Sequence, residues 1–148
     1  MLQDILKSVQ GNFGSVLEGA NLSSDKAGEL LKSTASSITE VSTEEMASGN
    51  ASGLMDLFSG KSEASSSNSI VKNIVSKLAG TVAEKFGIDK GMASSIAEKV
   101  VPMAINAITS KFKSSDSQDS SALMEMVGGD AAGSLLDKGK SMLGGMFN

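Results

Sequence analysis

Residues 60–62, Gly-Lys-Ser, match the last three positions of a phosphate-binding loop. Such a loop also needs a glycine five residues before its second glycine, and a β-strand ahead of it, so that backbone N–H groups can surround the phosphates. The required glycine position holds Met55, and no strand pattern precedes it. The same tripeptide recurs at 139–141, where the required position is Ser134. We therefore predict no nucleotide site.

Other reactive groups occur without the partners that catalysis needs. Ser-x-x-Lys, the nucleophile signature of one hydrolase class, occurs at 23–26, 69–72 and 110–113, and we interpret these pairs as helix caps and solvated side chains. The acidic pairs Glu44/Glu45 and Asp116/Asp119 lack the spacing of a calcium loop. The absence of His and Cys removes the usual ligands of zinc, copper and haem. We predict a protein that is not an enzyme and has no cofactor.

Composition narrows the range of partners and compartments. The 148 residues carry a net charge of −4, every cation is a lysine, and Trp and Tyr are absent. Nucleic-acid recognition normally uses arginine and stacking aromatic residues, so we predict no nucleic-acid partner. The N-terminus has neither the basic region nor the continuous apolar stretch of a secretory signal, and no apolar run approaches the length of a membrane-spanning helix. We expect a cytoplasmic protein without a transmembrane segment.

Apolar residues recur at three- and four-residue steps along almost the whole chain, which predicts an all-α fold. The pattern indicates helices over 2–17, 27–41, 54–58, 70–86 and 92–112.

Several residues indicate where these helices begin, end or bend. The segment 42–45, Ser-Thr-Glu-Glu, is typical of a capping box and predicts a separate short turn. Gly87 is a good residue to follow a helix end, and Asp89 is a good cap for the next helix. Pro102 lies inside that helix, where it removes the hydrogen bond to the Glu98 carbonyl and predicts a kink.

The two halves of the chain are similar to each other. The segment GLMDLFSG at 53–60 aligns with ALMEMVGG at 122–129. Upstream, the paired residues lie slightly closer together along the chain than in these two segments: Val16 pairs with Val82, Leu22 with Ile88, and Leu30 with Ile96. We call this upstream pairing the repeat alignment. We predict two degenerate helical repeats (helix, turn, long helix, short apolar helix) packed as one domain, with an amphipathic C-terminal helix. The expected units are 1–60, a Ser-rich linker at 61–69, 70–129, and the C-terminal helix at 130–148.

The segment LAGTVAEKFGIDKGMASSIAEKVVPMAINAI, at 78–108, resembles the core signature of the YidB-like family of bacterial proteins. In that family a helix ends in a Lys-[Leu/Phe]-Gly-[Val/Ile]-Asp turn, here 85–89, and the next helix carries an apolar-Pro step, here Val101 and Pro102. The segments at 53–60 and 141–147 resemble elements of relatives from Bacteroidetes. The resemblance implies an all-α fold of two related repeats and no established enzymatic role, and it supplies no catalytic residues.

We expect a non-enzymatic structural or interaction protein that associates with itself, and possibly with another protein, through short Met- and Leu-rich elements. The alternative is a small-molecule or lipid binder with an apolar cavity between the repeats. Contact of the C-terminal segment with a membrane surface is a further, less favoured interpretation, because interfacial Trp is absent. The predicted interaction residues are Leu54, Met55, Leu57, Phe58, Leu123, Met124, Met126, Val127, Met142, Leu143, Met146 and Phe147.

Overall fold

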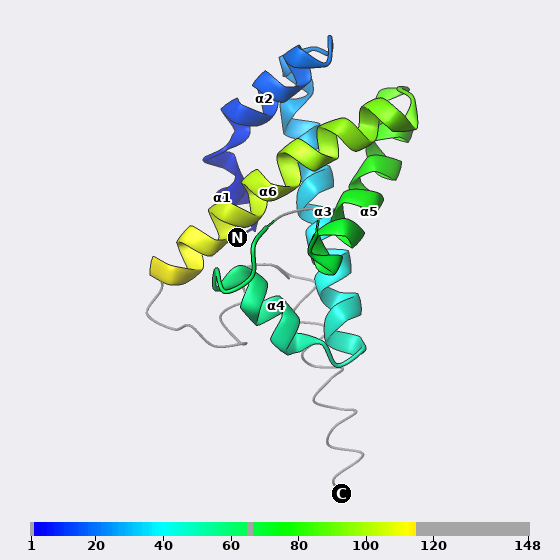
Figure 1. Cartoon of the computed structure of the whole chain (residues 1–148). Helices are drawn as coiled ribbons and strands as arrows, with labels where there is room; N and C mark the ends of the chain where they lie inside the picture. Colours follow the sequence, from blue (N-terminus) through cyan, green and yellow to red (C-terminus); the bar gives the residue numbers. More distant parts are fainter. Residues whose placement is uncertain (1, 65–66, 115–148) are drawn as a thin grey trace, which may run out of the picture.

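A computed structural model describes residues 2–64 and 67–114, the coloured part of Figure 1. The described residues form α-helices and one 3₁₀ turn, with no strand among them, so the all-α prediction is confirmed. The elements are α1 (Leu2–Lys7), α2 (Gln10–Gly19), η1 (Ser24–Lys26), α3 (Ala27–Ala47), α4 (Ala51–Phe58), α5 (Ser69–Phe86) and α6 (Lys90–Ser114).

The N-terminal region contains two helices, whereas the sequence predicts one over 2–17. The N–H groups of Ser8 and Val9 donate to carbonyl oxygens only three residues earlier, at 3.3 and 3.0 Å. The Ser8 hydroxyl also donates to the Ile5 carbonyl at 2.7 Å. These bonds tighten the chain into a turn between α1 and α2, and the helical apolar spacing on both sides hides this break. The prediction of a single helix is wrong.

Two helical hairpins dominate the fold. The first hairpin consists of α2, η1 and α3, and the second consists of α5 and α6. Each hairpin turns through one residue in the left-handed conformation, Asn21 (φ 61°) in the first and Gly87 (φ 63°) in the second. The N–H groups of the following residues, Leu22 and Ile88, donate to the carbonyl five residues earlier, at 2.8 and 3.2 Å. The two turns therefore share one hydrogen-bond pattern at positions that the repeat alignment pairs.

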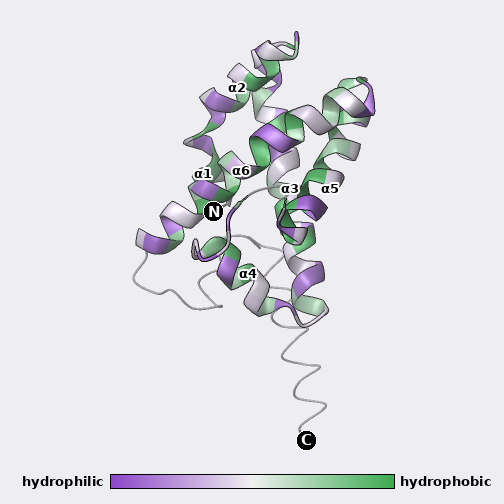
Figure 2. Ribbon diagram, in the orientation of Figure 1, coloured by the Kyte–Doolittle hydropathy of each residue, from purple (hydrophilic) through white to green (hydrophobic). Residues whose placement is uncertain are grey.

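The long helices α3 and α6 hold the hairpins together. Helix α5 packs against α6 and also against α3, while α2 packs against α3 and also against α6. Helices α1 and α4 each contact both α3 and α6 (Figure 1). Every helix mixes hydrophobic and hydrophilic residues around its circumference (Figure 2), and the apolar ones share one continuous core.

Helix α3 passes straight through the segment 42–45, where the sequence predicts a separate turn. Val41 is fully buried and Ser42 is nearly so, which means that the helix continues to bury its inner face there. The prediction of a separate short turn at 42–45 is therefore wrong, because burial of the inner face of α3 outweighs the local capping signal. Within the described part of the chain, the buried hydroxyls of Ser33 and Ser42 have no hydrogen-bond partner.

The second hairpin carries clearer local signals at its ends. The side chain of Asn68 accepts hydrogen bonds from the N–H groups of Ile70 and Val71, at 2.9 and 3.3 Å, so α5 begins one residue inside the predicted linker. Helix α6 continues through Pro102 to Ser114.

Candidate functional site

The predicted interaction residues of α4 lie mostly inside the molecule. Leu54 and Phe58 are fully buried, Leu57 is nearly so, and only Met55 is half-buried. Helix α4 packs against α3 and α6 of its own chain, so these side chains would have to leave the core before they could contact another molecule. The remaining predicted interaction residues, Leu123, Met124, Met126, Val127, Met142, Leu143, Met146 and Phe147, lie outside the described residues.

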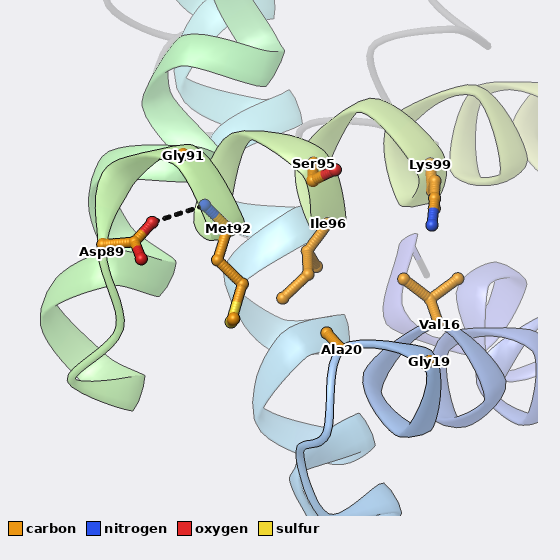
Figure 3. A pocket seen from close by; sticks show the side chains of 9 residues that line it. All are labelled: Val16, Gly19, Ala20, Asp89, Gly91, Met92, Ser95, Ile96 and Lys99. Atoms are coloured by element: carbon orange, nitrogen blue, oxygen red, sulfur yellow. Dashed lines mark hydrogen bonds between the residues drawn. The ribbon is translucent and has the colours of Figure 1, made fainter.

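An open cleft of about 360 Å³ lies between the end of α2 and the first turns of α6, beside the turns of both hairpins (Figure 3). We call it the α2–α6 cleft. Larger clefts of about 430 and 590 Å³ elsewhere are lined mainly by polar side chains. The α2–α6 cleft is lined by Val16, Gly19, Ala20, Asp89, Gly91, Met92, Ser95, Ile96 and Lys99.

The floor of this cleft is apolar and its rim is polar. In Figure 3 the side chains of Met92 and Ile96 extend from α6 toward Ala20, and Val16 extends from α2 toward α6. Met92 is 37% exposed, which is more than any other large hydrophobic side chain whose burial the structure describes. An apolar side chain from a partner would remove this surface from water.

The polar rim is partly committed to holding the fold. The Asp89 carboxylate accepts a hydrogen bond from the N–H of Met92 at 2.8 Å, which caps the first turn of α6. That bond fixes the backbone from which Met92 projects into the cleft. Lys99 stands one turn beyond Ile96 on the same side of α6 (Figure 3) and is exposed.

The predicted repeat offers a comparison for this cleft. The repeat alignment pairs Ala20 with Phe86, and Met92 with Lys26. Where α3 meets α5, the Phe86 ring is only 9% exposed, and the Lys26 ammonium lies 5.1 Å from its centroid. Where α2 meets α6, the residue that the alignment pairs with Phe86 is Ala20, which lines the cleft.

A second pair of residues in the repeat alignment also differs in burial. Val82 is fully buried between α5 and its neighbours, whereas its paired residue Val16 is half-buried at the cleft. At both pairs, the residue beside the cleft is therefore smaller or more exposed than the residue that the alignment pairs with it.

The acidic cluster at Glu44 and Glu45 has a structural role. The Lys77 ammonium of α5 contacts Glu44 of α3 at 2.5 Å and Glu40 at 3.4 Å. The hydrogen bond to Glu44 is the main cause that raises the pKa of Lys77 above its ordinary value. Glu45 accepts hydrogen bonds from Asn50 and Asn73. The contacts of Lys77 and Asn73 tie α3 to α5, so the interpretation of this cluster as merely solvated charge is incomplete.

Two other classes of site are missing from the described residues. No group of three or more Asp or Glu side chains in this part of the chain is placed to hold a metal ion. None of the helices between residues 2 and 114 combines the length and the apolar character that crossing a bilayer requires.

Our sequence-based list of interaction residues omits Val16, Ala20, Met92 and Ile96, which line the cleft. A signal for them exists in the sequence. The alignment that pairs Val16 with Val82 also sets Ala20 opposite Phe86, a replacement of a large buried side chain by a small one. Comparisons of the chain with models of known families, with curated proteins and with solved structures found no match, so the resemblance to the YidB-like family stays a prediction.

Proposed function

We propose that this protein is a non-enzymatic interaction protein that associates with itself, one copy inserting an apolar side chain into the α2–α6 cleft of another. The observation that carries the proposal is the contrast between Ala20 and Phe86. One interface between the hairpins contains a buried aromatic ring, and the other presents a cleft lined by Ala20, the residue that the repeat alignment pairs with that ring.

The shape of the cleft favours a protein side chain over a free small molecule or a lipid. Its volume of about 360 Å³ is near the lower limit of small-molecule sites, and it is an open groove rather than an enclosed cavity. The repeat alignment pairs Ala20 of the cleft with the buried Phe86, which supports an aromatic side chain as the ligand.

Such an anchor gives weak association. Burial of an aromatic side chain removes roughly 150–250 Å² from water, which at about 25 cal/mol per Å² contributes on the order of 4–6 kcal/mol. The contacts around the ring must offset the cost of association. The contribution of the ring then corresponds to a dissociation constant between roughly 40 μM and 1 mM. Self-association must therefore be measured at high protein concentration.

The test is to fill the cleft from within. Ala20→Phe places in α2 the side chain that α5 has at Phe86, and the new ring would cover Val16 and Ile96. We expect the molar mass of the wild type, measured by light scattering from about 10 μM to 1 mM, to rise with concentration. The Ala20→Phe variant should remain monomeric.

Ser36→Phe is the matched control, since it adds the same side chain at an exposed position of α3 away from the cleft. It should associate as the wild type does. A monomeric wild type across the whole range, or an Ala20→Phe variant that associates equally well, would overturn the proposal.

A further inference from the structure

The chain has few aromatic side chains to offer to a second copy. It contains five phenylalanines and neither Trp nor Tyr. Four of the five, Phe13, Phe58, Phe86 and Phe112, are at most 9% exposed in the core, so donating one of them would empty the core of the donor. The fifth, Phe147, belongs to residues 115–148, outside the described part of the chain.

Resting on the proposed function, we infer that Phe147 is the side chain that enters the α2–α6 cleft of a second copy. It is the aromatic residue that is left when the four phenylalanines buried in the described core are set aside. The cleft suits it because its lining includes the apolar residues Val16, Met92 and Ile96, and because the repeat alignment pairs its Ala20 with a buried phenylalanine, Phe86.

The residues before Phe147 fit the same surface. The segment 142–147 reads Met-Leu-Gly-Gly-Met-Phe and carries no charge. Its methionines can adapt to an irregular apolar floor such as that formed by Val16, Met92 and Ile96. Gly144 and Gly145 have no side chains, so the backbone of the segment can approach the cleft closely.

This contact joins two different surfaces, the cleft of one copy and the segment 142–147 of the next. Such a heterologous contact produces an open chain of molecules or a ring, rather than a symmetric pair. We therefore expect the average molar mass to pass beyond that of a dimer as concentration rises.

The segment of the same chain competes for the cleft. Helix α6 carries the chain about 27 Å from Ile96 to Ser114, at 1.5 Å per residue. Residues 115–141 are long enough to return over that distance. Because tethering two sites within one chain gives an effective concentration of about 1 mM, docking within one chain would suppress association at low concentration.

The experiment uses the full chain and a peptide of residues 138–148 labelled at its N-terminus. The receptor is full-length Phe147→Ala, whose own segment no longer competes, and binding is followed by fluorescence anisotropy. We expect the peptide to bind this variant, and to bind the double variant Phe147→Ala, Ala20→Phe at least about tenfold more weakly. A control peptide with alanine in place of Phe147 should bind the Phe147→Ala receptor as weakly as the unchanged peptide binds the double variant.

The outcomes separate this inference from the proposal on which it rests. Binding that is lost in both the double variant and the control peptide supports the inference. A wild type that associates through the cleft, together with a peptide that does not bind, overturns the inference and leaves the proposed self-association standing. A wild type that stays monomeric while the peptide binds Phe147→Ala places the segment in the cleft of its own chain, and overturns the contact between copies.

Discussion

The interface between α3 and α5, which we call sealed, contains a buried phenylalanine, whereas the interface between α2 and α6, which we call open, presents a cleft. Each joins the long helix of one hairpin to the shorter helix of the other. At the first interface, Phe86 is buried beside Lys26. At the second, Ala20 and Met92 occupy the paired positions and a cleft remains. The variants below test whether this one large side chain accounts for the difference.

A second difference lies further along the same two interfaces. Lys77 of α5 forms ion pairs with Glu40 and Glu44 of α3. The repeat alignment pairs Lys77 with Gly11, and pairs the two glutamates with Asn106 and Ser110. The open interface therefore lacks both the aromatic residue and the charged groups of the sealed one, so these two contributions can be tested separately.

The largest expected effect comes from opening the sealed interface. Phe86→Ala removes a buried ring and should lower the free energy of unfolding by about 3 kcal/mol, because the helices around it cannot close the cavity completely. Urea unfolding followed by circular dichroism measures this loss. The control is Met92→Ala at the open interface, which should cost less than about 1 kcal/mol because that side chain is already 37% exposed. Equal losses for the two variants would show that the interfaces do not differ as the structure indicates.

Two glycines of the second hairpin should respond to alanine with opposite signs. Gly87 has a φ of 63°, so Gly87→Ala forces a side chain into the left-handed region and should cost about 1 kcal/mol. Gly80 lies inside α5, and Gly80→Ala should stabilise the protein by up to about 1 kcal/mol through helix propensity. A new Cβ would have no heavy atom within 4 Å at either position outside its immediate chain neighbourhood, so crowding does not explain the contrast. Thermal unfolding of both variants measures it, and a shift of the same sign in both would contradict the assigned turn.

A smaller effect concerns the buried hydroxyls of α3, the long helix of the first hairpin. Ser33 and Ser42 lack partners in the described structure, and their paired residues in α6 are Lys99 and Ile108. Removing an unsatisfied buried hydroxyl relieves its desolvation cost. We expect Ser33→Ala and Ser42→Ala each to stabilise the protein by roughly 0.5–1 kcal/mol more than Ser36→Ala, an exposed control that reports helix propensity alone. Chemical denaturation decides this, and gains no larger than the control would mean that these hydroxyls are satisfied.

The sequence predicts most of the helices because their apolar spacing agrees with burial. It predicts Gly87 as a helix end and Asp89 as a cap from residue type alone, since both features act within a few residues. It fails at Ser8 and at Ser42, where the local signal is ambiguous and tertiary contacts decide between a turn and a continuing helix. The cleft escapes prediction for a different reason. The contrast between Ala20 and Phe86 is present in the sequence, but the structure is needed to show that Ala20 lines one cleft with Met92 and Ile96.

The smallest expected effect concerns the ion pairs of Lys77, and its pH dependence has a definite sign. The folded state raises the pKa of Lys77, chiefly through the hydrogen bond to Glu44, so the stabilisation is complete below the pKa of the unfolded chain and is lost as pH rises through the folded value. Lys77→Met keeps the aliphatic part of the side chain and removes the charge. Urea unfolding between pH 7 and about pH 11 should show a small difference between wild type and variant that shrinks above the ordinary lysine value of about 10.4. A difference that grows with pH would contradict the assigned pairing. If Lys77→Met leaves the self-association of the protein unchanged while Ala20→Phe abolishes it, then self-association depends on the missing ring at the cleft and not on the ion pairs of Lys77.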